Sequence, residues 1–142
     1  MQRILVALDG SPGQTEVLAA ALTLAQEQTA RLILFHSVSL PLPLPVSALA
    51  VPPDQVSTIM LESSQKALEE LARTAPRGVI ERVQVELGVP WRAVCEAART
   101  DGVDLVIIGS HGYGGIDRLL GTTAAKIVDH APCSVLVVRP KT

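Results

Sequence analysis

The stretch that says most about the fold of this chain is LVIIGSHG, residues 105–112. Four apolar residues lead directly into a turn bounded by two glycines, and a helical pattern opens a short way on at Gly121-Thr122-Thr123. Glycines let backbone N–H groups come close to a phosphate, and the unpaired amides at the start of a helix point toward an anion. A strand, a glycine turn and a helix in this order therefore predict an anion-binding site.

Strand-like and helix-like segments alternate along the rest of the chain. Five strands are expected at residues 3–8, 31–38, 79–87, 105–108 and 134–139. Four helices with apolar residues at three-four spacing are expected at residues 14–29, 54–74, 90–100 and 122–130. This alternation predicts an α/β fold, a doubly wound, Rossmann-like open sheet of five mostly parallel strands with helices on both faces. We expect one domain over residues 1–142, because no repeat or linker divides the chain.

The expected strand order brings two loops together. Right-handed crossovers wind the first three strands outward in one direction, and the next helical connection can return the fourth strand to the other side of the first. The order is then 3-2-1-4-5, with its reversal between the first and fourth strands, where ligands bind beyond the carboxyl ends. The first strand ends at Asp9-Gly10-Ser11 and the fourth at residues 109–112. We therefore expect these two segments to frame one crevice.

Composition excludes several classes of protein. The chain has 142 residues, 48% of them hydrophobic and 2% aromatic, which provides for a buried core and excludes a disordered chain. Such a core must be built from Val, Leu, Ile and Ala, which suits parallel strands covered by helices. A formal net charge of −2 and only three aromatic residues argue against nucleic-acid binding. Cys95 and Cys133 form neither a disulfide framework nor a metal-ligand spacing, so we expect reduced, buried thiols.

The sequence shows no sign of membrane contact. The N-terminus enters a strand at once, with no basic region followed by an apolar signal segment. The most apolar loop, residues 39–53, carries five prolines and cannot be a spanning helix. We expect a cytoplasmic protein without a membrane partner.

The residue types at the crevice suit a nucleotide. The Asp9 carboxylate can accept from a ribose hydroxyl or an adenine amino group, and amides around Gly112, Gly121 and Thr122 suit phosphate oxygens. The hydroxyls of Thr122 and Thr123 can donate to phosphate or lie near a bound Mg²⁺. Each feature also has a plain structural interpretation: glycines and aspartate form turns, and threonines cap helices.

Three segments together resemble the universal stress protein family: ILVALDGS at residues 4–11, DLVIIGSHG at 104–112 and APCSVLVVR at 131–139. The resemblance covers essentially the whole chain. It implies a five-stranded parallel sheet in a doubly wound α/β sandwich, usually dimeric through the last strand. It also implies that some members bind ATP while others do not.

ATP-binding members of that family resemble Gly-x2-Gly-x9-Gly followed by Ser or Thr. Gly109, Gly112, Gly121 and Thr122 match these residue types, but eight residues, not nine, separate Gly112 from Gly121. One missing residue can move an amide by about 3.5 Å, although two further glycines inside the loop allow a shorter path.

The resemblance adds two residues at other strand ends. Asp9 matches the family's adenosine-contacting acid, and Val38 matches a position whose backbone faces adenine. The candidate nucleotide-binding residues are Asp9, Val38, Gly109, Ser110, His111, Gly112, Gly121, Thr122 and Thr123.

These observations predict a protein that binds ATP, with or without Mg²⁺, and acts in stress response or signalling through a nucleotide-dependent loop or dimer state. One alternative is an interaction module of the same fold that binds no nucleotide and uses the apolar loop at 39–53. Another is a slow ATPase or phosphotransferase. No lysine directly follows Gly121, as a phosphate-loop NTPase requires. His111 could reach a γ-phosphate, whereas His36 and His130 have no visible nucleophile partner, and no catalytic residue is assigned.

The last expected strand, residues 134–139, predicts a homodimer. In the order 3-2-1-4-5 it is an edge strand, and it is apolar and free of internal proline. Such an edge invites aggregation unless it is covered, and pairing with its own copy across a two-fold axis would cover it.

Overall fold

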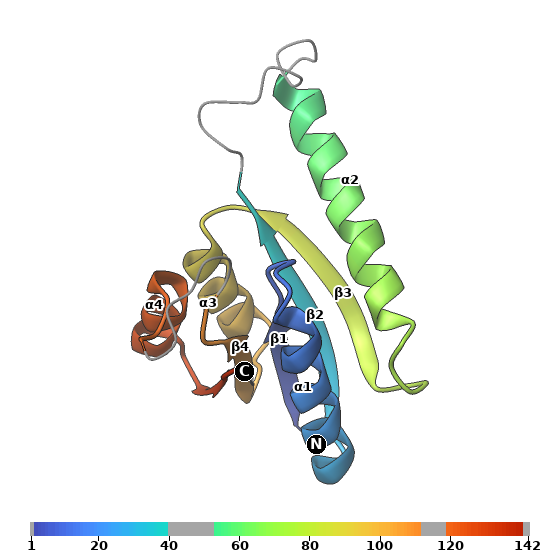
Figure 1. Cartoon of the computed structure of the whole chain (residues 1–142), viewed down its shortest axis with the longest axis vertical. Helices are drawn as coiled ribbons and strands as arrows, with labels where there is room; N and C mark the ends of the chain where they lie inside the picture. Colours follow the sequence, from blue (N-terminus) through green and yellow to red (C-terminus); the bar gives the residue numbers. More distant parts are fainter. Residues whose placement is uncertain (1, 40–52, 112–118, 141–142) are drawn as a thin grey trace.

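The computed structural model describes residues 2–39, 53–111 and 119–140 (Figure 1). The proline-rich loop, apart from its first and last residues, and Gly112 therefore lie outside the described residues. The strands are β1 Arg3–Ala7, β2 Arg31–Val38, β3 Ile80–Leu87, β4 Leu105–Gly109 and β5 Ser134–Val138. The helices are α1 Gln14–Gln28, α2 Pro53–Ala72, α3 Pro90–Thr100 and α4 Thr122–His130.

The sheet confirms the predicted fold. Its strand order is β3-β2-β1-β4-β5, and every neighbouring pair is parallel. β1 pairs with β2 on one side and with β4 on the other, so the strand order reverses at β1. The carboxyl ends of all strands lie at the same edge of the sheet, which is the edge where the two glycine-bearing turns emerge.

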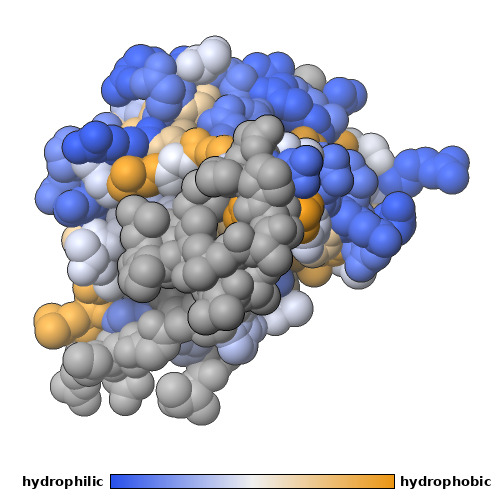
Figure 2. Space-filling view, turned by 90° about the horizontal axis from the view of Figure 1, so that it is seen from above, coloured by the Kyte–Doolittle hydropathy of each residue, from blue (hydrophilic) through white to orange (hydrophobic). Residues whose placement is uncertain are grey.

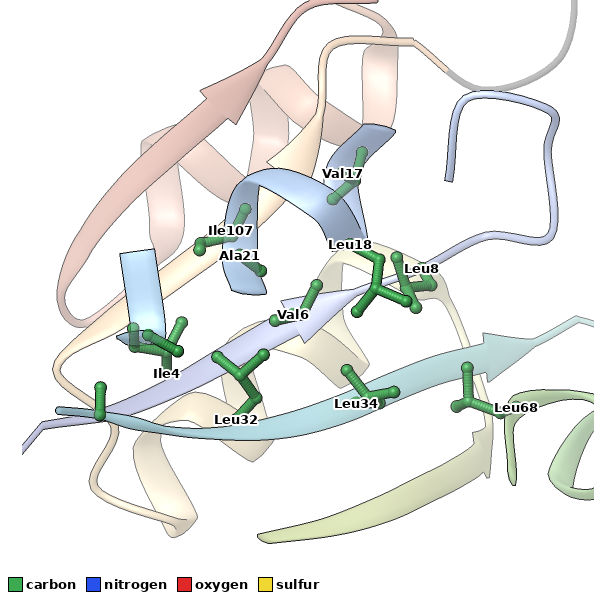
Figure 3. Packing of buried hydrophobic residues seen from close by; sticks show 12 residues of the cluster. Ile4, Val6, Leu8, Val17, Leu18, Ala21, Leu32, Leu34, Leu68 and Ile107 are labelled. Atoms are coloured by element: carbon green, nitrogen blue, oxygen red, sulfur yellow. The ribbon is translucent and has the colours of Figure 1, made fainter. Parts of the chain in front are cut away.

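Alternate residues of the central strands pack on opposite layers of helix. Ile4 and Val6 of β1 belong to a core cluster with Leu18 and Ala21 of α1 and Leu68 of α2, and Figure 3 shows these side chains between the sheet and the helices on one of its faces. Leu5, between Ile4 and Val6, belongs to a second cluster built with α3 and α4. All three β1 residues are fully buried, which explains the unbroken apolar sequence of this strand.

Four strand ends, in β1, β3, β4 and β5, differ from expectation by one residue, and three helix ends differ by one or two. α1 ends at Gln28 because Thr29 adopts a left-handed conformation with φ of 54°, and the Ala30 N–H donates to the Ala25 carbonyl at 2.9 Å. α2 begins at Pro53, not Asp54, since a proline needs no N–H partner at the first helical position. It ends at Ala72, not Thr74.

The cysteines behave as packing residues. Cys95 is buried on α3, Cys133 is half-buried before β5, and both thiols are free. Burial raises the pKa of Cys95, against the opposing effect of the Arg99 guanidinium. Burial also raises the pKa of Cys133, and the Asp104 carboxylate adds to the rise. Both thiols are therefore held in the neutral form, which is a poor nucleophile.

The described parts of the chain contain neither a candidate membrane-spanning helix nor a candidate metal-binding cluster. None of the helices there combines the length and the apolar character that crossing a bilayer demands. In the same ranges, no group of three or more His, Cys, Asp or Glu side chains is placed to hold a metal ion.

Truncating a central core side chain should destabilise the fold strongly. Ile33 of β2 is fully buried, whereas Ile59 on α2 is 55% exposed. We expect Ile33→Ala to lower the free energy of unfolding by about 2–5 kcal/mol, and the matched Ile59→Ala by less than about 0.5 kcal/mol. Urea unfolding measures both, and equal losses would contradict the described packing.

Candidate functional site

A cavity of about 950 Å³ opens at the carboxyl edge of the sheet. It is lined by the ends of β1, β2, β4 and β5 together with the starts of α1, α3 and α4. Figure 2 looks down on the molecule from above, the side where β2 and β3 end, and shows apolar side chains (orange) among hydrophilic ones (blue). The cavity lies beyond the carboxyl ends of β1 and β4, the two strands between which the strand order reverses. This is the position where open α/β sheets bind their ligands.

The end of β1 presents a fixed carboxylate. Oδ1 of Asp9 accepts from the Ser11 N–H at 2.9 Å, which closes a local turn. Gly10 has φ of 78°, a left-handed value that suits glycine, and its N–H donates to Oε1 of Gln14 at 3.1 Å. Oδ2 of Asp9 makes no hydrogen bond to a described residue. The exposed carboxylate of Asp9 is thus held through one oxygen, and Asp9 is one of the residues that line the cavity.

Backbone hydrogen bonds hold the described ends of the glycine loop, the segment between β4 and α4. The Ser110 N–H donates to the Val138 carbonyl at 2.9 Å, and the Gly121 N–H donates to the Ser110 carbonyl at 2.8 Å. A Cβ on Gly121 would lie 3.3 Å from that same oxygen, so only glycine allows this approach without adjustment. The sequence predicts that the Gly121 N–H binds a phosphate oxygen. In the structure this N–H instead donates to the Ser110 carbonyl within the protein.

The histidine of this loop is directed inward. Nδ1 of His111 lies 3.1 Å from Oγ of Ser110, whose side chain is almost fully buried. The other ring nitrogen, Nε2, is buried and has no hydrogen-bond partner among the described residues. A buried nitrogen cannot exchange protons with solvent readily, so this geometry does not suit a general base.

The start of α4 offers backbone donors. Gly121 is the N-cap, with φ of −62° and ψ of 161°, and no side chain caps the helix. The first intrahelical bond in this turn runs from the Ala125 N–H to the Gly121 carbonyl at 2.9 Å. The amides of Thr122, Thr123 and Ala124 precede it and point out of the helix. Because neither threonine caps the helix, their exposed hydroxyls remain available at the cavity.

The end of β2 differs from the sequence expectation. Val38 lines the cavity, but its carbonyl accepts from the Gly88 N–H at 3.0 Å and so faces β3. Successive residues of a strand direct their backbone groups to opposite neighbours, and the Phe35 carbonyl accepts from Leu8 on the β1 side at 2.8 Å. Ser37 therefore directs its N–H and C=O toward β1, which has already ended. The backbone N–H and C=O that lack a partner strand at the end of β2 are therefore those of Ser37, not those of Val38.

The structure brings most of the predicted site residues to one cavity. Its lining includes Asp9, Val38, Gly109, Ser110, His111, Gly121, Thr122 and Thr123. Gly112 lies outside the described residues. Sequence analysis missed His36 and Ser37, which also line the cavity. A sequence feature that could have identified them is the expected length of the strand at residues 31–38, which is greater than that of the strand at residues 3–8. A longer strand extends beyond its neighbour and leaves backbone groups unpaired at its end.

Comparison with known proteins places the chain among its relatives. The model of the universal stress protein family matches residues 1–139. The chain belongs to the universal stress protein family. It is 33% identical to universal stress protein A homolog 1 of Coxiella burnetii over 138 residues, covering 96% of this chain and 95% of the relative. It is 32% identical to universal stress protein YxiE of Bacillus subtilis over 146 residues, covering 96% and 98%.

Solved structures of universal stress proteins share the fold. The UspA protein from Lactobacillus plantarum superimposes with a TM-score of 0.76 at 22% identity, covering 97% of each chain. A universal stress protein solved in complex with cAMP superimposes with a TM-score of 0.69 at 23% identity, covering 96% of each chain. This chain therefore shares its α/β fold with these solved structures.

Substitution of Gly109 tests how tightly the end of β4 packs against α1 beneath the cavity of this universal stress protein. A Cβ at position 109 would lie 3.2 Å from Cγ2 of Val17 on α1. We expect Gly109→Ala to cost about 1–3 kcal/mol of stability through overpacking. In the double variant with Val17→Ala the clash is relieved, so the combined loss should be smaller than the sum by at least about 0.5 kcal/mol. Urea unfolding of the four proteins measures this coupling, and simple additivity would contradict the contact.

Proposed function

We propose that this universal stress protein binds an adenine nucleotide, ATP in the first place, in the cavity at the ends of β1, β2 and β4. The observation that supports this most is the joint placement of the Asp9 carboxylate and the open N-terminus of α4 on one cavity. A carboxylate suits the hydroxyls of a sugar, and a helix start suits phosphate. The cavity volume of about 950 Å³ also lies within the range of small-molecule sites.

The base would lie at the end of β2. The Ser37 N–H and C=O form a donor–acceptor pair that complements N1 and the N6 amino group of adenine. Buried apolar side chains of Phe35, Ile108 and Ile127 line the same cavity and provide a nonpolar surface for the ring. Oδ2 of Asp9, at the neighbouring strand end, would then accept from a ribose hydroxyl.

The phosphates would lie at the start of α4. The amides of Thr122, Thr123 and Ala124 are the donors in this turn that no helical bond uses, and the two threonine hydroxyls stand beside them. Because the Ser110 carbonyl occupies the Gly121 amide, the helix start rather than Gly121 would contact the anion. The threonine hydroxyls are also oxygen ligands of the kind that Mg²⁺ accepts. The solved relative in complex with cAMP supports this proposal, since cAMP is also an adenine nucleotide.

We infer binding without rapid turnover. Among the described cavity residues, His111 is the histidine nearest the proposed phosphate site in sequence, and its nitrogens are directed at Ser110 or buried. Binding would then act through a nucleotide-dependent loop or dimer state in stress response or signalling.

Asp9→Asn tests the sugar contact. The asparagine retains an Oδ1 for the Ser11 N–H but replaces the second carboxylate oxygen with an amide. We expect Mg-ATP to bind about 10-fold more weakly by titration calorimetry, because a hydrogen bond to a charged acceptor contributes about 1.5–3 kcal/mol. Asp129→Asn, on the exposed end of α4, is the matched control and should bind like the wild type.

The wild-type protein must also be stabilised by its ligand. Millimolar Mg-ATP should raise the Tm in proportion to its occupancy. A wild-type protein that neither binds Mg-ATP in calorimetry nor shifts its Tm would refute the nucleotide proposal.

We also propose a homodimer through β5. The Val138 carbonyl faces β4, because it accepts from the Ser110 N–H at 2.9 Å. By alternation, the backbone groups of Val135 and Val137 point away from the sheet. Leu136, between them, is 39% exposed, so the edge is apolar. The outward backbone groups of Val135 and Val137 have no partner strand within the described chain. A second copy of β5 would supply the missing backbone partners.

Val137→Pro tests the edge. Proline removes the outward N–H of this residue but leaves the hydrogen bonds between β4 and β5 in place. We expect the variant to be monomeric in light scattering at micromolar concentration, while Val137→Ala, which also loses side-chain packing but keeps its N–H, stays dimeric. A wild-type monomer at that concentration, or a Val137→Pro dimer, would remove the proposal.

A further inference from the structure

β2 extends beyond its neighbour β1 at the proposed base site. The β1–β2 ladder ends with Ala7 opposite Phe35, and the bond from the Leu8 N–H to the Phe35 carbonyl at 2.8 Å follows it. β2 continues to Val38. If the ladder continued in the usual parallel pattern, its next bond would run from the Ser37 N–H to the Leu8 carbonyl.

The histidine of β2 takes that place. Nδ1 of His36 lies 2.6 Å from the Leu8 carbonyl oxygen. A carbonyl can only accept, so Nδ1 carries the hydrogen and donates it. Leu8 is 4% exposed, so its carbonyl requires a partner within the protein, and the imidazole satisfies it in place of the Ser37 amide.

Ser37 is held from the opposite side as well. Its Oγ donates to the Gly88 carbonyl at 3.0 Å, and Oγ of Ser39 donates to the same oxygen at 3.0 Å. The Gly88 N–H in turn donates to the Val38 carbonyl at 3.0 Å. These three bonds tie the end of β2 to the end of β3, so the Ser37 peptide is held in position without a backbone partner on the β1 side.

We propose that His36 is a positioning residue that occupies the Leu8 carbonyl and thereby keeps the Ser37 N–H and C=O free to recognise the ligand base. The ligand part of this proposal rests on the proposed nucleotide binding. An N–H donor beside a C=O acceptor matches the acceptor N1 and the donor N6 of adenine. Guanine presents the opposite pattern at the corresponding atoms, with a donor N1–H and an acceptor O6. His36 therefore acts on base selectivity rather than on phosphate affinity.

Three variants separate the donor from the bulk of the side chain. His36→Leu removes the hydrogen bond to the Leu8 carbonyl. His36→Asn is the matched control, because its side-chain amide nitrogen can occupy the place of Nδ1. His36→Gln carries its amide at the place of Nε2 and cannot reach in the same way. Urea unfolding shows which variants are folded, and if His36→Leu is not, His36→Gln replaces it in the comparison with His36→Asn.

The first measurement needs no ligand. Amide hydrogen exchange of the full chain by NMR should show the Ser37 N–H exchanging faster than the Phe35 N–H, which lies in the ladder. In His36→Leu the Leu8 carbonyl loses its partner. The Ser37 N–H should move to it and exchange at least about 10-fold more slowly, because a buried carbonyl without a partner is unfavourable. His36→Asn should exchange like the wild type. Unchanged exchange in the folded variant that lacks the donor would overturn the proposal.

The second measurement compares ATP with GTP by calorimetry. The wild type and His36→Asn should favour ATP, and the ratio of the two Kd values should fall about 10-fold in the variant without the donor, as loss of one base hydrogen bond requires. A retained ratio would overturn the role of His36 in selectivity. If the wild type binds neither nucleotide, the proposed function fails, and the exchange measurement still decides whether His36 controls the Ser37 amide.

Discussion

The site depends on β1 being paired in parallel with β2 and β4 at once. Ile4, Leu5 and Val6 are fully buried, with alternate side chains facing α1 and α3, so the strand can occupy only the centre of the sheet. The register sets Ile4 opposite Leu105 and Val6 opposite Ile107, so the segments that follow the two strands, which carry Asp9 and Ser110, reach the same cavity. The carboxylate and the glycine loop therefore meet because two apolar strands pair, not because the polar residues attract one another.

Unequal strand lengths make a cavity at this edge. β1 ends at Ala7 while β2 runs to Val38, so backbone groups at the end of β2 lose their ladder partners. Buried backbone groups need partners, and the chain supplies them locally: His36 for the Leu8 carbonyl and Gly121 for the Ser110 carbonyl. The groups that remain open face the cavity, at Ser37 and at the start of α4. A ligand that supplies matching partners would complete the edge.

Sequence reasoning predicted the elements and their order, and it misplaced two backbone contacts. The first contact was assigned to Val38 instead of Ser37. Whether Ser37 or Val38 faces β1 depends on the pairing register, and a shift of one residue exchanges them. The second depends on the hydrogen bond between the Gly121 N–H and the Ser110 carbonyl, which joins residues too far apart in the sequence for a local pattern to predict it. The end of α1 depends in the same way on the left-handed Thr29, a conformation that threonine seldom signals in sequence.

The sequence by itself determined the family, the parallel α/β architecture and the two turns that carry the polar residues. Apolar periodicity and glycine placement are local properties, and a chain with five such strands and right-handed crossovers has few ways to fold. Only the tertiary structure decided which backbone groups are open and which are occupied. The hydrogen bond between His36 and Leu8 joins residues 28 positions apart in the sequence. It forms because the folded sheet brings the two groups together, and no local sequence pattern encodes that proximity.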